Sequence, residues 1–335
     1  MKAFAVLLAV ACSIHSVAEA EEPVPFEIAH RGASGYLPEH TREAVVMAHG
    51  LGAAYIEQDV VLSADEVPVV LHDIHLDDVS DVATRFPGRA RPDGKHYALD
   101  FTLAELKQLE MRERFKPATG ERIFPNRYSG SGTVFRIVTL EESLRIIEGL
   151  NASTGREAGV YPEIKRPAWH LDQGKDISAV VLPILKRFGY EDKNDPCYLQ
   201  CFEYDEVRRL REALGYRGRL IQLLGGGNKI SEGNTDNSRF RSPEGLRELA
   251  KWVDGIGPPI SEVVKGDDAA TRRITPLAAD ARAAGLAVHP YTARADELPK
   301  WARDYDDLIG QLREAGVGGY FTDFPGLLRV QRSPE

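Results

Sequence analysis

The sequence predicts an α/β fold, specifically a TIM (β/α)8 barrel with a small insertion after its second strand. Short apolar segments with strand character alternate with amphipathic helical segments, which is typical of parallel α/β folds. The expected strands are 26–30, 54–59, 69–72, 160–164, 198–202, 219–224, 253–256, 286–289 and 318–322. If 69–72 extends the second strand as a hairpin, eight core strands remain, the number that closes a TIM barrel.

Helical segments fall between these strands and carry recognisable ends. The expected helices are 41–50, 139–150, 176–188, 205–214, 243–252, 275–284 and 304–315. Thr139 before two glutamates indicates a helix start, and Gly285 and Gly316 stand where helices should end. The alternative is a doubly wound open sheet, but that fold gathers its chemistry at one switch point. Here polar candidates follow several different strands, which favours a closed barrel.

Residues 74–135 interrupt the alternation. They are rich in loop-forming residues, with one helix expected at 102–110. A long insertion at this position is typical of a lid or a substrate-selecting subdomain at the catalytic rim of a barrel.

Residues 1–20 are predicted to be a signal peptide, which leaves residues 21–335 as the barrel domain. A basic start is followed by a short apolar run and by the small-x-small site Ala18-Glu19-Ala20. Cleavage before Cys12, as in a lipoprotein, is the alternative to cleavage after Ala20. The apolar run is shorter than the roughly 20 residues that span a bilayer, so we expect no transmembrane segment.

The net charge and the cysteines limit the partners and the chemistry. A formal net charge of −9 argues against nucleic acid, which calls for a basic surface. Beyond Cys12, the chain holds only Cys197 and Cys201. At strand rise their Cα atoms lie roughly 13 Å apart, whereas a disulfide needs about 7 Å or less. We therefore expect two free thiols.

Three acidic residues stand at the ends of predicted strands. Glu57 and Asp59 are two apart, so both carboxylates project from one face of a strand, and Glu163 ends another strand. A bound cation would relieve the repulsion between them, and oxygen-only ligation indicates Ca²⁺ or Mg²⁺ rather than zinc. Salt bridges to Arg or Lys are the alternative explanation for such a pair.

Two histidines and two cations occupy the same kind of position. His30 and His72 each end a strand, and histidine suits proton transfer near neutral pH. Arg31 and Lys165 stand beside the acids, where they either neutralise the carboxylates or, together with a metal ion, hold a phosphate ester.

At these residues the chain resembles the glycerophosphodiester phosphodiesterase family, in particular its periplasmic bacterial branch. The resemblance spans about residues 26–330, and its motifs occur in order with compatible spacing. The matching stretches are His30–Thr41, Tyr55–Asp59, Val70–Asp73, Tyr161–Lys165, Tyr198–Phe202, His289–Thr292 and Phe321–Pro325. One departure is His40, where many members of the family carry Asn.

The resemblance implies a role for each of these side chains. Metal ligands would be Glu57, Asp59 and Glu163, with calcium as the expected ion and magnesium as the alternative. The acid–base pair would be His30 and His72. Substrate-binding residues would be Arg31, Glu39, Lys165, Gln200, Tyr291 and Asp323. Within that set, Arg31 and Lys165 would hold the phosphate, and Glu39 would support the site or touch the glycerol moiety.

The implied reaction is metal-dependent hydrolysis of glycerophosphodiesters, such as glycerophosphocholine, glycerophosphoethanolamine and glycerophosphoglycerol, to glycerol 3-phosphate and an alcohol. This is a step of glycerol and phospholipid-headgroup metabolism. The expected partner is this small-molecule substrate, the expected location is the periplasm, and a homodimer is left open. The alternatives are phospholipase D-like cleavage of lysolipids, for which the polar insertion offers little apolar surface, and a non-catalytic surface lipoprotein.

Overall fold

The computed structural model describes residues 24–130, 132–225 and 237–332. The predicted signal peptide and Cys12 lie outside the described residues. Within the described residues, no helix combines the length and the apolar character needed to cross a membrane.

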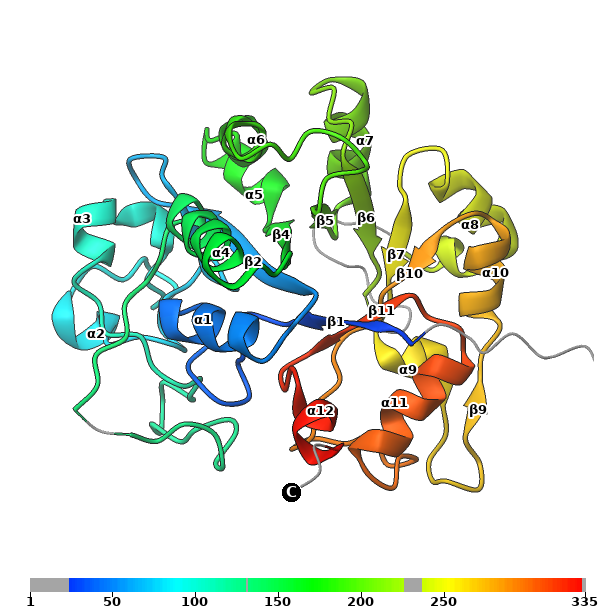
Figure 1. Cartoon of the computed structure of the whole chain (residues 1–335). Coiled ribbons are helices and arrows are strands. Elements are labelled where there is room, and N and C mark those ends of the chain that lie inside the picture. Colours follow the sequence, from blue (N-terminus) through cyan, green and yellow to red (C-terminus); the bar gives the residue numbers. More distant parts are fainter. Residues whose placement is uncertain (1–23, 131, 226–236, 333–335) are drawn as a thin grey trace, which may run out of the picture.

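Eight parallel strands form a nearly closed barrel with helices around it (Figure 1), so the predicted fold class is confirmed. The strands are β1 (Phe26–Ala29), β2 (Tyr55–Leu62), β4 (Gly159–Ile164), β5 (Tyr198–Cys201), β6 (Arg219–Leu223), β7 (Gly255–Gly257), β10 (Ala287–Val288) and β11 (Gly319–Thr322). Their order is β10-β7-β6-β5-β4-β2-β1-β11. Backbone hydrogen bonds from Gly318 to Val288 (3.1 Å) and from Phe321 to Pro290 (2.9 Å) bring the last two strand regions together. The short strand β3 (Pro68–Val70) pairs antiparallel with β2, which confirms the predicted hairpin.

The seven predicted helices are present with small shifts at their ends. They are α1 (Arg42–Gly50), α4 (Leu140–Thr154), α6 (Ile177–Arg187), α7 (Tyr204–Glu212), α8 (Pro243–Leu249), α10 (Leu277–Ala283) and α11 (Tyr305–Glu314). Helix α4 begins with a complete capping box between Thr139 and Glu142, as its sequence indicated. The structure adds α5 (Pro167–Asp172), α9 (Ile260–Val263), α12 (Leu327–Arg332) and the hairpin β8 (Val264–Lys265) and β9 (Arg273–Ile274). These pieces are too short to show a clear hydrophobic period.

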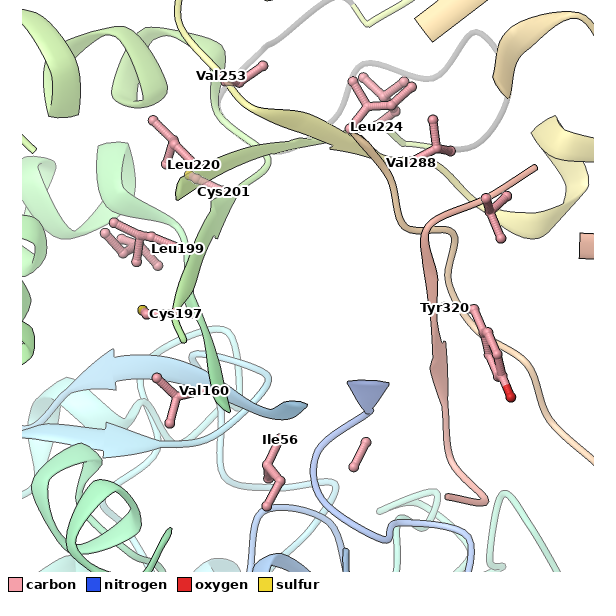
Figure 2. Close-up of a cluster of buried hydrophobic side chains, with 14 of the residues drawn as sticks. Ile56, Val160, Cys197, Leu199, Cys201, Leu220, Leu224, Val253, Val288 and Tyr320 are labelled. Carbon is pink, nitrogen blue, oxygen red and sulfur yellow. The ribbon is translucent and has the colours of Figure 1, made fainter. Parts of the chain in front are cut away.

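The outer face of the barrel packs against the helices. Figure 2 shows Ile56, Val160, Leu199 and Leu220 on this side, and all four are fully buried. Cys201 belongs to the same layer, and both it and Cys197 are buried free thiols, as predicted. Because side chains alternate along a strand, the neighbours of these apolar residues point into the barrel. This alternation directs the acids of β2 and β4 toward the barrel interior.

The insertion lies between β3 and α4 and packs around a second hydrophobic core, which also includes Val61 of β2 and Val69 of β3. It contains α2 (Val82–Arg85), the 3₁₀ helix η1 (Ala98–Asp100) and α3 (Leu103–Leu106). The helix expected at 102–110 is therefore shorter than predicted. Leu76, Phe101 and Leu109 are fully buried in this second core. The insertion thus packs as a folded unit beside the strand ends.

Glu113 is a buried carboxyl group of the insertion, only 8% exposed, and its Oε2 atom finds no hydrogen-bond partner among the described residues. Burial raises the pKa of Glu113 to about 7. The native state therefore binds this proton more tightly than the unfolded chain does, and this costs stability once the pH exceeds the unfolded pKa. We expect Glu113→Gln to raise the free energy of unfolding at pH 8 by about 3 kcal/mol, and hardly at all near pH 4. Urea unfolding at both pH values measures the difference, and equal gains at both would contradict this account.

Candidate active site

Three carboxylates meet at the carboxyl ends of β2 and β4. Glu57 and Asp59 come from β2, and Glu163 lies beside Asp59 in the register of β4. All three are buried, and one oxygen from each lies within 4.8 Å of the others. The structure thus brings together all three predicted metal ligands. Lys165 Nζ also lies 2.7 Å from Glu163 Oε1, and Arg31 Nε lies 3.7 Å from Asp59 Oδ2, so the alternative of salt bridges holds for two of the acids.

The donor set fits a hard cation. Asp59 Oδ2 is held by His40 Nε2 at 2.8 Å, whereas Asp59 Oδ1 is buried and finds no hydrogen-bond partner in the described part of the chain. Gln200 donates to Glu57 Oε1 at 2.9 Å and fixes that carboxylate. An oxygen that is desolvated and unpaired calls for a positive charge, and carboxylate oxygens are the preferred ligands of Ca²⁺ and Mg²⁺. The acidic triad could therefore hold a divalent metal ion.

The two acids of β2 have opposite pKa shifts. Burial and the nearby charge of Asp59 raise the pKa of Glu57 well above its usual value. Burial also opposes ionisation of Asp59, but Lys165, His72 and His40 outweigh it and hold the pKa of Asp59 well below its usual value. A bound cation would stabilise the ionised form of Glu57 and so oppose this rise in its pKa.

His30 follows β1 and forms a pair with Asp323, which follows β11. His30 Nδ1 lies 2.5 Å from Asp323 Oδ1, and His30 Nε2 lies 3.8 Å from Glu57 Oε2. Burial and the charge of Arg31 lower the pKa of His30 to about 4, so the ring is neutral at pH 7. Since a carboxylate can only accept, Nδ1 carries the proton and Nε2 keeps its lone pair. Asp323 therefore lies behind His30, where it lines a smaller recess beside the main cavity.

His72 follows β3 and has a similar partner. Its Nδ1 lies 3.0 Å from Asp73 Oδ1, and the histidine side chain is 31% exposed. Burial and the charges of Arg31 and Lys165 lower the pKa of His72. Both predicted histidines thus face the triad from different strand ends, and each has an aspartate at Nδ1.

Arg31 stands between the acids because its backbone adopts a left-handed conformation, with φ of 59°. Its backbone amide donates to Glu57 Oε2 at 2.9 Å, and its guanidinium binds Glu39 at 3.0 Å and lies 3.7 Å from Asp59. The insertion residue Arg114 binds Glu39 from the other side, at 2.6 Å. Glu39 therefore supports the site through two arginines, one of the two roles expected for it.

A cavity of about 390 Å³ opens over these residues. Its polar wall contains His30, Arg31, Glu57, Asp59, His72, Glu163 and Gln200, and its other wall contains Phe202, Leu223, Pro259, Ile260, Tyr291, Pro299 and Trp301. The Tyr291 hydroxyl donates to the backbone of Leu224 at 2.7 Å and fixes the ring in that second wall. The sequence showed little apolar surface in the insertion. The apolar side of the cavity is instead formed by segments that follow in the second half of the barrel.

A smaller recess of about 250 Å³ lies beside the cavity, toward the insertion. It is lined next to both histidines by Glu39, Arg114, Arg127, Arg294 and Asp323. None of these arginines was a predicted site residue, because they lie in segments without a regular hydrophobic period. Asp73 could have been found, since it stands directly beside His72 in the quoted motif.

The sequence matches a known family. A sequence profile of the Glycerophosphoryl diester phosphodiesterase family matches residues 30–327. The chain belongs to this family. It is 39% identical to a glycerophosphodiester phosphodiesterase of Haemophilus influenzae, with 94% of this chain and 92% of the relative aligned. It is 36% identical to a glycerophosphodiester phosphodiesterase of Treponema pallidum, with 90% and 89% aligned.

Solved structures share the barrel of the glycerophosphoryl diester phosphodiesterase family. A phosphodiesterase of Oleispira antarctica, solved with the product sn-glycerol-3-phosphate, has a TM-score of 0.62 at 21% identity and covers 92% of this chain and 96% of its own. A glycerophosphodiester phosphodiesterase of Thermotoga maritima has a TM-score of 0.56 at 19% identity, with 92% and 98% covered. At these identities the likeness concerns the fold.

Proposed function

We propose that this protein hydrolyses glycerophosphodiesters to glycerol 3-phosphate and an alcohol. The observation that carries the proposal is one cavity in which three acids, two histidines and Arg31 face each other. The chain aligns over most of its length with relatives that are named for this activity. A non-catalytic lipoprotein would have no reason to keep these groups buried and aligned.

The proposed metal ion is calcium, held by Glu57, Asp59 and Glu163. When bound, such an ion neutralises charge that develops on a phosphate oxygen in the transition state. Arg31 orients the phosphate from the side of the cavity, and we assign the same task to Lys165. Magnesium is the alternative ion, since its ligands are also oxygens.

His30 acts as the base in this proposal. Its Nε2 accepts a proton from the nucleophile, either water or the 2-hydroxyl of the substrate, while Asp323 holds Nδ1. His72 acts as the acid and protonates the departing alkoxide. The positive charges of Arg31 and Lys165 help to lower the pKa of His72. A bound phosphate counteracts these charges and so favours the protonated form of His72.

The test is release of glycerol 3-phosphate from glycerophosphocholine, measured in the presence of calcium, of magnesium or of excess EDTA. We expect turnover with calcium, loss of turnover after thorough chelation and recovery when calcium is restored. Turnover that survives chelation would refute the metal site. Lysophosphatidylcholine in the same assay tests the second candidate substrate, to which the apolar wall with Phe202 and Trp301 is suited.

We also propose that the protein is exported to the periplasm, with cleavage after Ala20. The basic start, the short apolar run and the small residues before position 21 support this. Mass spectrometry of the mature N-terminus separates this cleavage from lipidation at Cys12.

A further inference from the structure

Two arginines of the insertion reach the aspartates behind the two histidines. Arg127 binds Asp323, the partner of His30, and Arg114 binds Asp73, the partner of His72. Neither arginine belongs to the barrel strands. Each arginine thus links the insertion to the aspartate that holds one of the two histidines.

Arg127 is fixed on both sides. Its NH2 group donates to Asp323 Oδ2 at 2.7 Å, and its Nε and NH2 groups donate to Asp296 at 2.8 and 3.1 Å. The side chain is only 5% exposed, and its guanidinium lies 3.6 Å from the centre of the Phe124 ring. Asp323 thus gives one oxygen to His30 and the other to Arg127 and to Arg294, whose Nε group donates to the same Oδ2 atom at 2.8 Å. This arrangement prevents the carboxylate from turning.

Arg114 repeats this arrangement at the second histidine. Its NH1 group donates to Asp73 Oδ2 at 2.7 Å, while Asp73 Oδ1 faces His72. Its Nε and NH2 groups bind Glu39 at 3.1 and 2.6 Å. Again one carboxylate oxygen serves the histidine and the other serves an arginine that is anchored elsewhere.

We propose that Arg114 and Arg127 are positioning residues, which fix the orientation and the tautomer of His72 and His30 by holding Asp73 and Asp323. A guanidinium suits this task because its fork binds two acids at once in fixed directions, whereas an ammonium is a single point charge. The insertion then takes part in catalysis, because two of its side chains hold the aspartates that orient the histidines. This inference rests on the proposed function, because it assigns the histidines to the proton transfers.

The test uses Arg127→Lys and Arg114→Lys in the full chain. Residues that orient a reacting side chain without touching the substrate typically contribute about 10- to 100-fold to activity. We therefore expect kcat to fall by that factor, with KM nearly unchanged. Arg91→Lys is the matched control, because Arg91 binds Asp100 at 2.7 and 2.8 Å in the insertion, away from the cavity. If kcat in both test variants stays within twofold of the control, the proposal is wrong.

A spectroscopic readout separates positioning from loss of folding. ¹⁵N NMR of the histidine rings should show His30 protonated at Nδ1 in the wild type, and a shifted Nδ1 signal in Arg127→Lys because the hydrogen bond to Asp323 is weakened. Should that variant fold poorly, Asp296→Asn releases Arg127 without touching Asp323 and should shift the same signal. An unchanged His30 Nδ1 signal in a folded variant overturns the proposal. A wild type that releases no glycerol 3-phosphate refutes the proposed function instead.

Discussion

Asp59→Asn is expected to abolish tight calcium binding and to lower kcat/KM at least about 100-fold. Residues that only hold a metal ligand in place contribute up to about 100-fold to activity or metal affinity. Asp59 is itself a proposed ligand, so its effect should be at least as large. Its Oδ1 is buried and finds no hydrogen-bond partner among the described residues, while His40 holds Oδ2. The amide keeps the shape of the side chain but removes the charge that a cation needs.

Titration calorimetry with calcium measures the first effect, and the glycerophosphocholine assay measures the second. Asp100→Asn is the control, because Asp100 binds Arg91 in the insertion and lies outside the cavity. Calcium binding at wild-type affinity in Asp59→Asn would rule out the proposed ligand set.

Asp323→Asn should lower kcat by as much as about 10⁴-fold, the size of effect seen when an aspartate that holds a catalytic histidine is replaced by asparagine. In the native protein Asp323 accepts the proton of His30 Nδ1. An amide nitrogen in its place would donate to Nδ1, so the ring would carry its proton on Nε2. His30 would then have no lone pair facing the nucleophile.

The leaving group distinguishes the roles of the two histidines. If His30 is the base, the loss of kcat in Asp323→Asn should be equally large for a nitrophenyl phosphodiester of glycerol. Its nitrophenolate leaving group needs no acid. Asp77→Asn is the matched control, because Asp77 Oδ1 lies 2.7 Å from His96 Nδ1 in a buried pair outside the cavity. Near-normal turnover of the nitrophenyl substrate by Asp323→Asn would assign His30 as the acid.

The sequence was enough to predict the barrel and the inner face of its rim. Glu57 and Asp59 follow the two-residue alternation of a strand, and that alternation decides which side chains point inward. His30 and His72 stand at strand ends, where a TIM barrel gathers its chemistry. These inferences needed only local periodicity, together with the resemblance to a family.

The supporting residues could not be predicted in this way. Arg114 and Arg127 lie in irregular loops of the insertion, and no period shows where their side chains point. Asp323 was expected to line the pocket, but its pairing with His30 could not be predicted, because it depends on contacts between β1 and β11 that only the folded barrel brings together. His40 looked like a simple variation of the family motif, yet it binds Asp59.

Because β1 pairs with β11, turnover requires that the first and the last barrel strands have come together. His30 and Asp323 are 293 residues apart in the chain, and their strands are the second-last and last in the order of the sheet. A contact of such sequence separation forms only after a large loss of chain entropy. A chain still being synthesised, with β1 made and β11 not yet available, lacks Asp323, the residue that holds His30 Nδ1. The protein should therefore become active only when its last strand joins the first, so full-length folding and catalytic competence arise together.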